Sequence, residues 1–291
     1  MPVWHPSSSE VGEVPERAVL RRKAQALCAL HHGPEPLLLL NVWDAASARL
    51  VESLGFPAIA TTSSGVANSL GYADGERLSR GEMLAVVARI AHAVTVPVSA
   101  DLEAGYGEGE DAVKHTVRAA VEAGAAGFNL EDARRGVLLP FEVAVQRVRA
   151  ARAAASETGV PLVINARSDA FHPGYVCGDR FAEAVRRANA YREAGADCLF
   201  LPFVSEAELI GRLARAVNGP LNILAGAQTP PLPELKRLGV ARVSVGGALA
   251  RAALSVIRRA SDELRATGRF DFADGIIAHA EMNRLLSHEA G

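Results

Sequence analysis

Short apolar runs alternate with longer stretches of helical periodicity along most of the chain. The runs are rich in β-branched and aliphatic residues, and the stretches between them carry Ala, Arg and Glu with apolar residues every three or four positions. This alternation is typical of βα units built around a parallel sheet. Eight runs are predicted to be strands: 36–41, 58–62, 96–100, 127–131, 161–166, 198–202, 221–224 and 242–245.

The stretches between and after these runs predict helices. Four of them end at a glycine that suits a left-handed helix stop: Gly55, Gly124, Gly159 and Gly195. Eight βα units in about the typical ~250 residues favour a (β/α)8 TIM barrel, with an open doubly wound sheet as the alternative. A barrel needs one helix after its last strand, so a second one is a candidate for packing on another subunit. The predicted helices are 45–54, 80–93, 110–123, 141–158, 180–194, 206–217, 249–267 and 274–287.

The composition excludes several classes of partner. The chain has 291 residues and a formal net charge of −2, and its arginines are scattered along predicted helices. Nucleic-acid binding is therefore not expected, because it requires a concentrated positive field. The N-terminal region is polar and lacks an apolar stretch, so we expect a disordered tail over 1–16 and no membrane span. Cys28, Cys177 and Cys198 are odd in number and far apart, which argues against a disulfide framework and favours a cytoplasmic protein.

Polar side chains gather where the predicted strands end. In barrels of this kind the chemistry occurs at the carboxyl ends of the strands, in the loops that lead to the helices. The residues at these positions are Asn41, Asp44, Thr62, Ser63, Ser64, Asp101, Glu103, Glu131, Asp132, Asn165, Arg167, Asp169 and Asn222. This concentration indicates a functional site at the mouth of the barrel.

Asp101 and Glu103 are two residues apart on one extended segment, so their side chains point the same way. Together with Glu131 and Asp74 they would surround one hard divalent cation with oxygens, which suits Mg²⁺ or Mn²⁺. No histidine accompanies them at a zinc-like spacing, so zinc is disfavoured. The alternative is that these acids cap a helix or pair with arginines.

The segment after Asp101 contains three glycines, Gly105, Gly107 and Gly109. A glycine-rich loop between a strand and a helix is the usual place for a phosphate or dinucleotide. The spacing here matches neither G-x-G-x-x-G nor G-x-x-x-x-G-K-[ST]. A tightly turned loop beside the acids is therefore predicted in place of a nucleotide site.

Two further features at the mouth suit anionic ligands. Arg167 would present its planar guanidinium group to a carboxylate or phosphonate. The alternative is an ion pair with Asp169 or Glu131. The turn 62–64 offers hydroxyls and backbone N–H groups to a second anionic group, or is a plain turn. His172 in "DAFHPGY" is either a general base or a solvated loop histidine.

Four stretches of the chain resemble the isocitrate lyase and phosphoenolpyruvate mutase superfamily. Their order and spacing carry the resemblance, which extends from about residue 38 to the C-terminus. The stretches are "NVWDAASARLVESLGFPAIATTSSGVANSLGYAD" at 41–74, "VPVSADLEAGYGEGEDAVKHTVRAAVEAGAAGFNLED" at 96–132, "PLVINARSDAF" at 161–171 and "PLNIL…LKRLGVARVSVGGALARAAL" at 220–254.

The resemblance implies an architecture and a substrate class. It implies a single barrel domain over 17–291, whose C-terminal helices in the region 251–291 swap between the subunits of a homodimer, usually within a homotetramer. It also implies Mg²⁺ at the mouth and a small 2-oxo acid or related carboxylate as substrate. Substrates in the family undergo C–C or C–P bond chemistry through an enolate.

The resemblance also implies roles for individual residues. Asp101 matches the direct metal ligand, and Asp74, Glu103 and Glu131 match acids that reach the metal directly or through water. Arg167 matches the arginine that binds the other anionic end of the substrate. The full set of candidate substrate-binding residues is Thr62, Ser63, Ser64, Trp43, Arg167 and Asn222.

The chain departs from the family pattern in two places. The family usually has D-x-D-T-G-Y-G where this chain has Glu103 and Ala104 in place of the second Asp and the Thr. The lyases have a K-[KR]-C-G-[HQ] gating loop and the mutases a loop with Lys and Asn, whereas "EDARRGVLLP" at 131–140 has none of these and leads straight into a predicted helix. This argues against Cys-dependent cleavage and against the usual phosphonomutase reaction. Arg134 or Arg135 is the candidate substitute as a mobile cation.

These features together predict a Mg²⁺-dependent lyase that acts on a 2-oxo acid or related carboxylate through a metal-stabilised enolate, by C–C cleavage or decarboxylation. Its candidate catalytic residues are Asp101, Arg167 and Glu131. The alternatives are phosphonomutase or phosphonopyruvate hydrolase chemistry, and a non-catalytic protein that binds 2-oxo acids.

Overall fold

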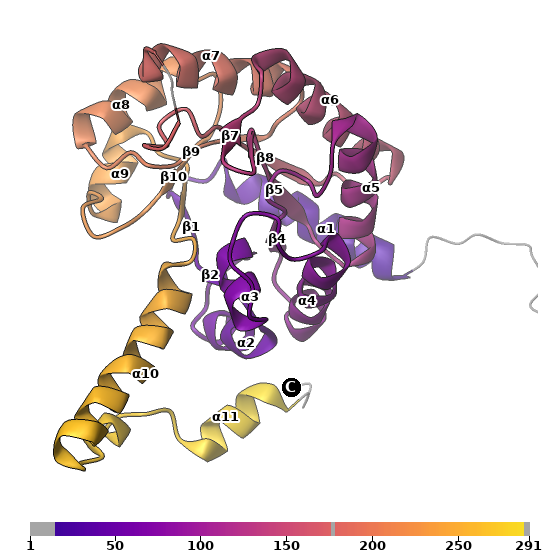
Figure 1. The fold of residues 1–291 in the computed structure, drawn as a ribbon. Helices are drawn as coiled ribbons and strands as arrows, with labels where there is room; N and C mark the ends of the chain where they lie inside the picture. The colour runs from indigo at the N-terminus through magenta and orange to yellow at the C-terminus, as the bar shows by residue number, and fades with distance from the viewer. Residues whose placement is uncertain (1–14, 176–177, 288–291) are drawn as a thin grey trace, which may run out of the picture.

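The computed structural model describes residues 15–175 and 178–287, and within them eight parallel strands form a barrel (Figure 1). The strand order is β1-β11-β10-β9-β8-β5-β4-β3-β2. Only Leu40 separates β1 from β2, and its carbonyl accepts a hydrogen bond from the Ala60 N–H at 3.0 Å, so these two segments act as one strand that completes the ring. The predicted (β/α)8 barrel is confirmed, and the open-sheet alternative is wrong. The segments are β1 Leu37–Leu39, β2 Asn41–Val42, β3 Ile59–Thr61, β4 Val98–Asp101, β5 Gly127–Glu131, β8 Val163–Arg167, β9 Cys198–Leu201, β10 Leu221–Leu224 and β11 Arg242–Ser244.

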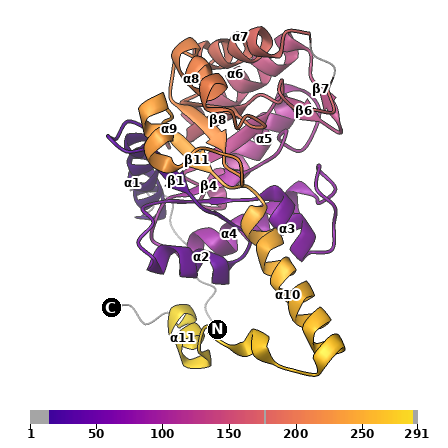
Figure 2. The same cartoon turned by 90° about the vertical axis from the view of Figure 1, so that its left-hand side faces the viewer.

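Helices surround the barrel (Figures 1 and 2). Their apolar faces pack on the strands, whose residues are almost all buried. The four predicted glycine stops all have positive φ, between 72° and 107°, which is the left-handed conformation that ends a helix. The helices of this ring are α2 Ala45–Ser53, α3 Ser63–Ser69, α4 Arg80–Ala93, α5 Gly109–Glu122, α6 Phe141–Glu157, α7 Arg180–Glu193, α8 Ala207–Ala216 and α9 Leu232–Leu238.

Helix α1, Pro15–Leu30, covers the amino-terminal end of the barrel and was not predicted. Its buried residue Leu27 packs against Gly127, the first residue of β5, where a Cβ would lie 2.9 Å from Leu27 and 2.7 Å from the Val163 carbonyl. Gly127 is therefore required by this close approach. The predicted tail over 1–16 lies outside the described residues except for Pro15 and Glu16, which begin α1.

The C-terminal arm, which we define as residues 248–287, extends away from the barrel (Figures 1 and 2). It consists of α10 Ala248–Thr267, the 3-10 turn η1 Asp271–Ala273 and α11 His279–Leu286. The predicted helix over 274–287 is thus shorter than expected, because Gly275 has a φ of 73° and residues 274–278 are not helical. Helix α11 returns to α2, where Arg49 Nε donates to the Leu285 carbonyl at 2.8 Å.

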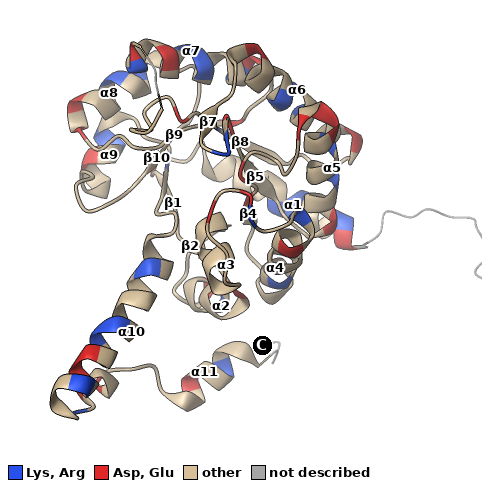
Figure 3. Ribbon diagram, viewed as in Figure 1, with Lys and Arg blue, Asp and Glu red and all other residues tan. Residues whose placement is uncertain are grey.

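Basic and acidic residues occur together on the outer helices (Figure 3). In the described part of the chain, no helix is both long enough and apolar enough to span a bilayer. Cys28 and Cys198 are free thiols, and Cys177 lies outside the described residues.

Candidate active site

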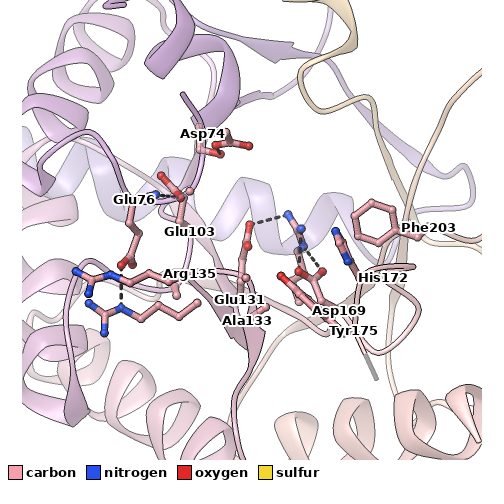
Figure 4. A pocket seen from close by; sticks show the side chains of 16 residues that line it. Asp74, Glu76, Glu103, Glu131, Ala133, Arg135, Asp169, His172, Tyr175 and Phe203 are labelled. Carbon is pink, nitrogen blue, oxygen red and sulfur yellow. Dashed lines mark hydrogen bonds and ion pairs between the residues drawn. The ribbon is translucent and has the colours of Figure 1, made fainter. Parts of the chain in front are cut away.

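The carboxyl ends of the strands enclose a cavity of about 240 Å³ (Figure 4). It shares lining residues with a larger cavity of about 1010 Å³ in the mouth of the barrel. The residues common to both are Ser63, Asp74, Arg167 and Phe203. Glu103 and Glu131 line the smaller cavity, and Asp101 lines the larger one. The structure therefore brings the predicted acids and Arg167 to one end of the barrel.

Asp101 ends β4 and is buried at 8% exposure. Its Oδ2 accepts a hydrogen bond from the Ser63 N–H at 2.9 Å, and its own N–H donates to Thr61 Oγ1 at 2.8 Å. Its Oδ1 is buried and has no hydrogen-bond partner among the described residues. Ser63 also donates through Oγ to Asp74 Oδ1 at 3.2 Å, so one serine joins the two aspartates.

Glu103 lies on the same wall, two residues after the end of β4. Its carboxylate accepts hydrogen bonds from the Glu76 N–H and from the Tyr106 hydroxyl, the latter at 3.1 Å. Burial, with the nearby charges of Asp101 and Asp74, raises the pKa of Glu103 to about 7. Burial and Asp101 likewise raise the pKa of Asp74. These carboxylates therefore repel one another, and water screens the repulsion least at the buried Asp101 and Glu103, because Asp74 is exposed.

The glycines beside the acids serve a tight turn, as predicted. Gly105 has a φ of 87° and Gly107 a φ of 151°, and a Cβ at Gly107 would lie 2.6 Å from the Cβ of Ala112. The buried Arg147 of α6 donates to the carbonyls of Ala104, Gly107 and Gly109. The Arg147 side chain thus holds this loop through three of its backbone carbonyls.

Arg167, at the end of β8, is already paired with acids. Its Nη1 donates to Glu131 Oε1 at 2.6 Å, and its Nε donates to Asp169 Oδ1 at 2.7 Å. The ion-pair alternative considered for Arg167 is therefore what the structure contains. Burial raises the pKa of Glu131 well above its ordinary value, and the charge of Arg167 offsets only part of that effect.

Asp132 is turned away from the cavity and anchors the residues around it. The residue is 3% exposed, and its carboxylate accepts hydrogen bonds from the Tyr191 hydroxyl at 2.7 Å, from Arg187 Nη1 at 3.1 Å and from the Asp169 N–H at 2.8 Å. Because Asp169 in turn holds Arg167, this buried network fixes the orientation of the guanidinium.

The segment expected to lead directly into a helix forms a hairpin instead, with β6 Ala133–Arg134 and β7 Val137–Leu138. Arg135 and Gly136 have φ values of 50° and 79°, which is the geometry of a two-residue type I′ turn. Arg134 pairs with Glu76 at 2.9 Å and with Glu108 at 3.1 Å. Both arginines line the smaller cavity, and Arg134 is held in place by two acids.

The structure places the remaining candidates in different positions. Ser63 and Ser64 line the mouth, with Ser64 Oγ 3.0 Å from Thr62 Oγ1, but the Ser63 N–H is occupied by Asp101. Trp43 lies in a separate cleft between α3 and α10. Asn222 is fully buried in β10 and is not among the residues that line the two cavities.

Several lining residues were missed, namely Glu76, Tyr175 and Phe203. Phe203 lies two residues after the end of β9. It therefore belongs to the strand-end positions considered above, but only polar residues were selected there. Glu76 and Tyr175 are in loops with no pattern that marks them. His172, weighed as a base or a solvated residue, is half-buried against Tyr175 and Phe203.

The acids are neighbours without forming a compact ligand cluster. Across the described ranges, no three His, Cys, Asp or Glu side chains are grouped as a ready metal site. The unpartnered Asp101 Oδ1 and the raised pKa values of the surrounding carboxylates nevertheless fit a cation, because a positive ion would satisfy the oxygen and relieve the repulsion. Oxygen donors of this kind suit Mg²⁺ or Mn²⁺.

The fold and site define a TIM-barrel protein whose mouth is lined by acids together with Arg167, which two of those acids hold in place. The family model described as phosphoenolpyruvate phosphomutase matches residues 27–265. The chain is 33% identical over 207 residues to the 2-methylisocitrate lyase of Escherichia coli K12. The aligned region covers 67% of this chain and 68% of that enzyme. The chain belongs to the isocitrate lyase and phosphoenolpyruvate mutase superfamily, and the prediction of an enzyme of this family is confirmed.

Solved structures agree with this assignment. A candidate lyase/mutase from Burkholderia cenocepacia J2315 has a TM-score of 0.86 at 40% identity, with 92% of this chain and 96% of that chain covered. Oxaloacetate acetylhydrolase in complex with the product oxalate has a TM-score of 0.81 at 27% identity, with 91% and 94% covered.

Proposed function

We propose that the protein is a Mg²⁺-dependent lyase that acts on a 2-oxo acid or related carboxylate, by C–C cleavage or decarboxylation. The observation that carries the proposal is the buried Asp101 Oδ1, which has no partner in the described part of the chain and is surrounded by carboxylates with raised pKa values. An anionic oxygen in that position costs free energy unless a cation binds it. Mn²⁺ would suit the same donors.

Four acids would hold the metal. Asp101 would bind it directly, and Asp74, Glu103 and Glu131 would reach it directly or through water. Since Ser63 lies between Asp101 and Asp74, water is expected to complete the ligand set, and Mg²⁺ commonly retains several waters. When bound, the ion would act as a Lewis acid on the oxygens of the 2-oxo acid.

The chain's own residues would bind and orient the substrate. Arg167 has its fork immobilised by Glu131 and Asp169, so it would present N–H donors to the cavity without a loss of side-chain freedom. Ser64 would contribute a hydroxyl from the other side of the mouth. Relatives named 2-methylisocitrate lyase and oxaloacetate acetylhydrolase support a carboxylate as substrate.

The metal assignment is tested by an Asp101→Asn variant, which keeps the shape and the acceptor for the Ser63 N–H while removing the charge. We expect Mn²⁺ or Mg²⁺ affinity, measured by calorimetry, to fall at least about 100-fold, because a direct anionic ligand is lost. The control is Glu110→Gln, which removes an exposed acid at the start of α5 and should leave metal affinity unchanged. An Asp101→Asn protein that folds normally and keeps wild-type affinity would rule out the assignment.

A substrate panel separates the reaction classes. The panel contains oxaloacetate, pyruvate, 2-oxoglutarate, hydroxy diacids and phosphonopyruvate, each with and without Mg²⁺. Mg²⁺-dependent turnover of a carboxylate by C–C cleavage is expected. Turnover of phosphonopyruvate alone would favour the C–P alternative, and Mg²⁺-enhanced binding without any turnover would favour the non-catalytic alternative.

A further inference from the structure

Three aromatic side chains form one side of the smaller cavity, and we call them the aromatic wall: His172, Tyr175 and Phe203. The His172 ring stacks on Tyr175 with centroids 4.2 Å apart and meets Phe203 edge-on at 4.8 Å. Figure 4 shows the wall on the side of Asp169, across the cavity from Asp74 and Glu103. A substrate whose acidic end lies among the carboxylates would therefore extend its tail toward aromatic rings.

Phe203 is held in an unusual conformation for a bulky residue. Its φ is 65°, in the left-handed region, and 44% of the residue is exposed. The exposed ring lines both the smaller cavity and the larger mouth. Strained backbone at a binding surface commonly marks a functional contact, and an exposed aromatic ring offers apolar area to a ligand.

The charges beside the wall disfavour a second anionic group on the substrate. The Arg167 guanidinium carbon lies 5.8 Å from the Phe203 ring centroid, and the same guanidinium is paired with Glu131 and Asp169. Asp169 alone accepts hydrogen bonds from both Nε and Nη2 of this guanidinium, so the charge of Arg167 is already compensated beside the wall. A tail carboxylate would lose its water there without gaining a cation, whereas an uncharged tail would bury apolar surface against the rings.

Two other arginines line the larger cavity and bear on the same question. Arg180 donates to the carbonyls of Phe171 and Tyr175, at 3.1 and 3.4 Å, so it supports the loop that carries the wall. Arg251 belongs to α10 and lines the larger cavity but not the smaller one. A diacid would direct its second carboxylate toward Arg251 or toward Arg135, which Figure 4 shows beside Glu76, across the cavity from the wall.

We propose that the substrate of this enzyme has an uncharged apolar tail that packs on the aromatic wall: a 4-hydroxy-2-oxo monocarboxylate with an alkyl or aryl group on C4, in preference to a diacid. Cleavage of its C3–C4 bond would leave the electron pair on the 2-oxo acid as an enolate, and the tail would depart as an aldehyde once the hydroxyl proton is lost. The proposal rests on the proposed function, which assigns the acidic end of the substrate to the metal and its ligands. Phe203 lines both cavities, so a tail that packs on its ring can continue from the smaller cavity into the mouth, whose volume is about 1010 Å³.

The test compares two ligands that differ in one terminal group, 2-oxopentanoate and 2-oxoglutarate, with phenylpyruvate as an aryl example and pyruvate as the tail-less reference. Affinities are measured by calorimetry on the full chain with saturating Mg²⁺. We expect 2-oxopentanoate and phenylpyruvate to bind at least tenfold more tightly than 2-oxoglutarate. In a Phe203→Ala variant their affinity relative to pyruvate should fall about tenfold, whereas Phe270→Ala, the same change at an exposed position on the C-terminal arm, should leave the ratios unchanged.

The outcomes distinguish this inference from the proposed function. Two results would overturn the apolar-tail assignment: tighter binding of 2-oxoglutarate that is lost in Arg251→Ala, or affinities relative to pyruvate that Phe203→Ala leaves unchanged. In either case Mg²⁺-dependent binding of pyruvate would still support the metal site. Pyruvate binding that is absent, or that does not depend on Mg²⁺, would overturn the proposed function and this inference together.

Discussion

A histidine and an arginine meet at the closed end of the barrel, far from the acidic mouth. His31 is 4% exposed, its Nδ1–H donates to the Leu27 carbonyl at 2.7 Å, and its Nε2 lies 3.5 Å from Arg242 Nη1. Burial and the charge of Arg242 lower the pKa of His31 to about 4. Folding therefore requires the neutral imidazole, and an unfolded chain binds one more proton at mildly acidic pH.

This histidine predicts a specific acid sensitivity. The neutral form of His31 gives its full contribution to the free energy of unfolding above the pKa of about 6.5 that the histidine has in the unfolded chain. As the pH falls from that value toward 4 the free energy of unfolding decreases, by about 2 kcal/mol between pH 7 and pH 5. A His31→Gln variant, which keeps a donor for Leu27 and an acceptor for Arg242, should lack that part of the pH dependence. Urea unfolding at pH 7 and pH 5 measures the difference. Equal pH dependence in both proteins would show that His31 does not titrate as described.

At the scale of elements, three segments interlock over the acidic side of the cavity: loop 70–79, loop 102–108 and the β6–β7 hairpin. Glu76 joins them, because its N–H donates to Glu103 while its carboxylate accepts from the Tyr106 N–H at 2.8 Å and from Arg134 at 2.9 Å. The Glu76 and Arg134 side chains are 7% and 14% exposed, so their ion pair is poorly screened by water. The hairpin thus anchors the loop that carries Asp74.

Removal of Arg134 should loosen that anchor. In Arg134→Ala the Glu76 carboxylate loses its cation, and we expect a destabilisation of about 1–3 kcal/mol with faster amide exchange in 70–79. Hydrogen exchange followed by mass spectrometry reports on the loop directly. The matched control is Arg118→Ala, which breaks a pair with Glu157 at 52% and 56% exposure and should cost about 0–1 kcal/mol. Unchanged exchange in 70–79 would mean that other contacts hold the loop.

At the scale of the whole molecule, the C-terminal arm is the part with the most exposed apolar surface. Leu254 and Ile257 lie three residues apart on α10 and are 53% and 61% exposed. Isolated exposed apolar residues are common, but several on one projecting helix indicate an interface. Swapping of this arm between subunits would bury the exposed face, and a homodimer or homotetramer is therefore still our prediction.

Charged substitutions on α10 test this prediction. A Leu254→Asp/Ile257→Asp double variant should shift the mass measured by light scattering toward the monomer, because two desolvated carboxylates oppose association. Val143→Asp, at a 39% exposed position on α6, is the control and should keep the wild-type mass. A wild-type protein that is monomeric at micromolar concentration would contradict the predicted assembly.

The alternation of apolar runs and periodic stretches was sufficient to predict the barrel. Eight strands separated by helices leave few other ways to bury their apolar faces, and glycine stops mark the helix ends through local backbone preference alone. The same reasoning predicted where the candidate site lies, since a parallel barrel brings every strand end to one rim. Asp101, Glu131 and Arg167 were found in this way.

Only the tertiary structure decided how those residues are paired. The pair of Arg167 with Asp169 is local, but the pair of Arg167 with Glu131 and the hydrogen bond from Ser63 to Asp101 join residues far apart in the chain. The burial that raises the pKa of Glu103 likewise depends on distant segments. Local pattern carries no information on such contacts, because they depend on how loops of different lengths fold over the rim. The sequence by itself determined the barrel and the position of its mouth, and the packing of the loops determined which groups in that mouth are free to act.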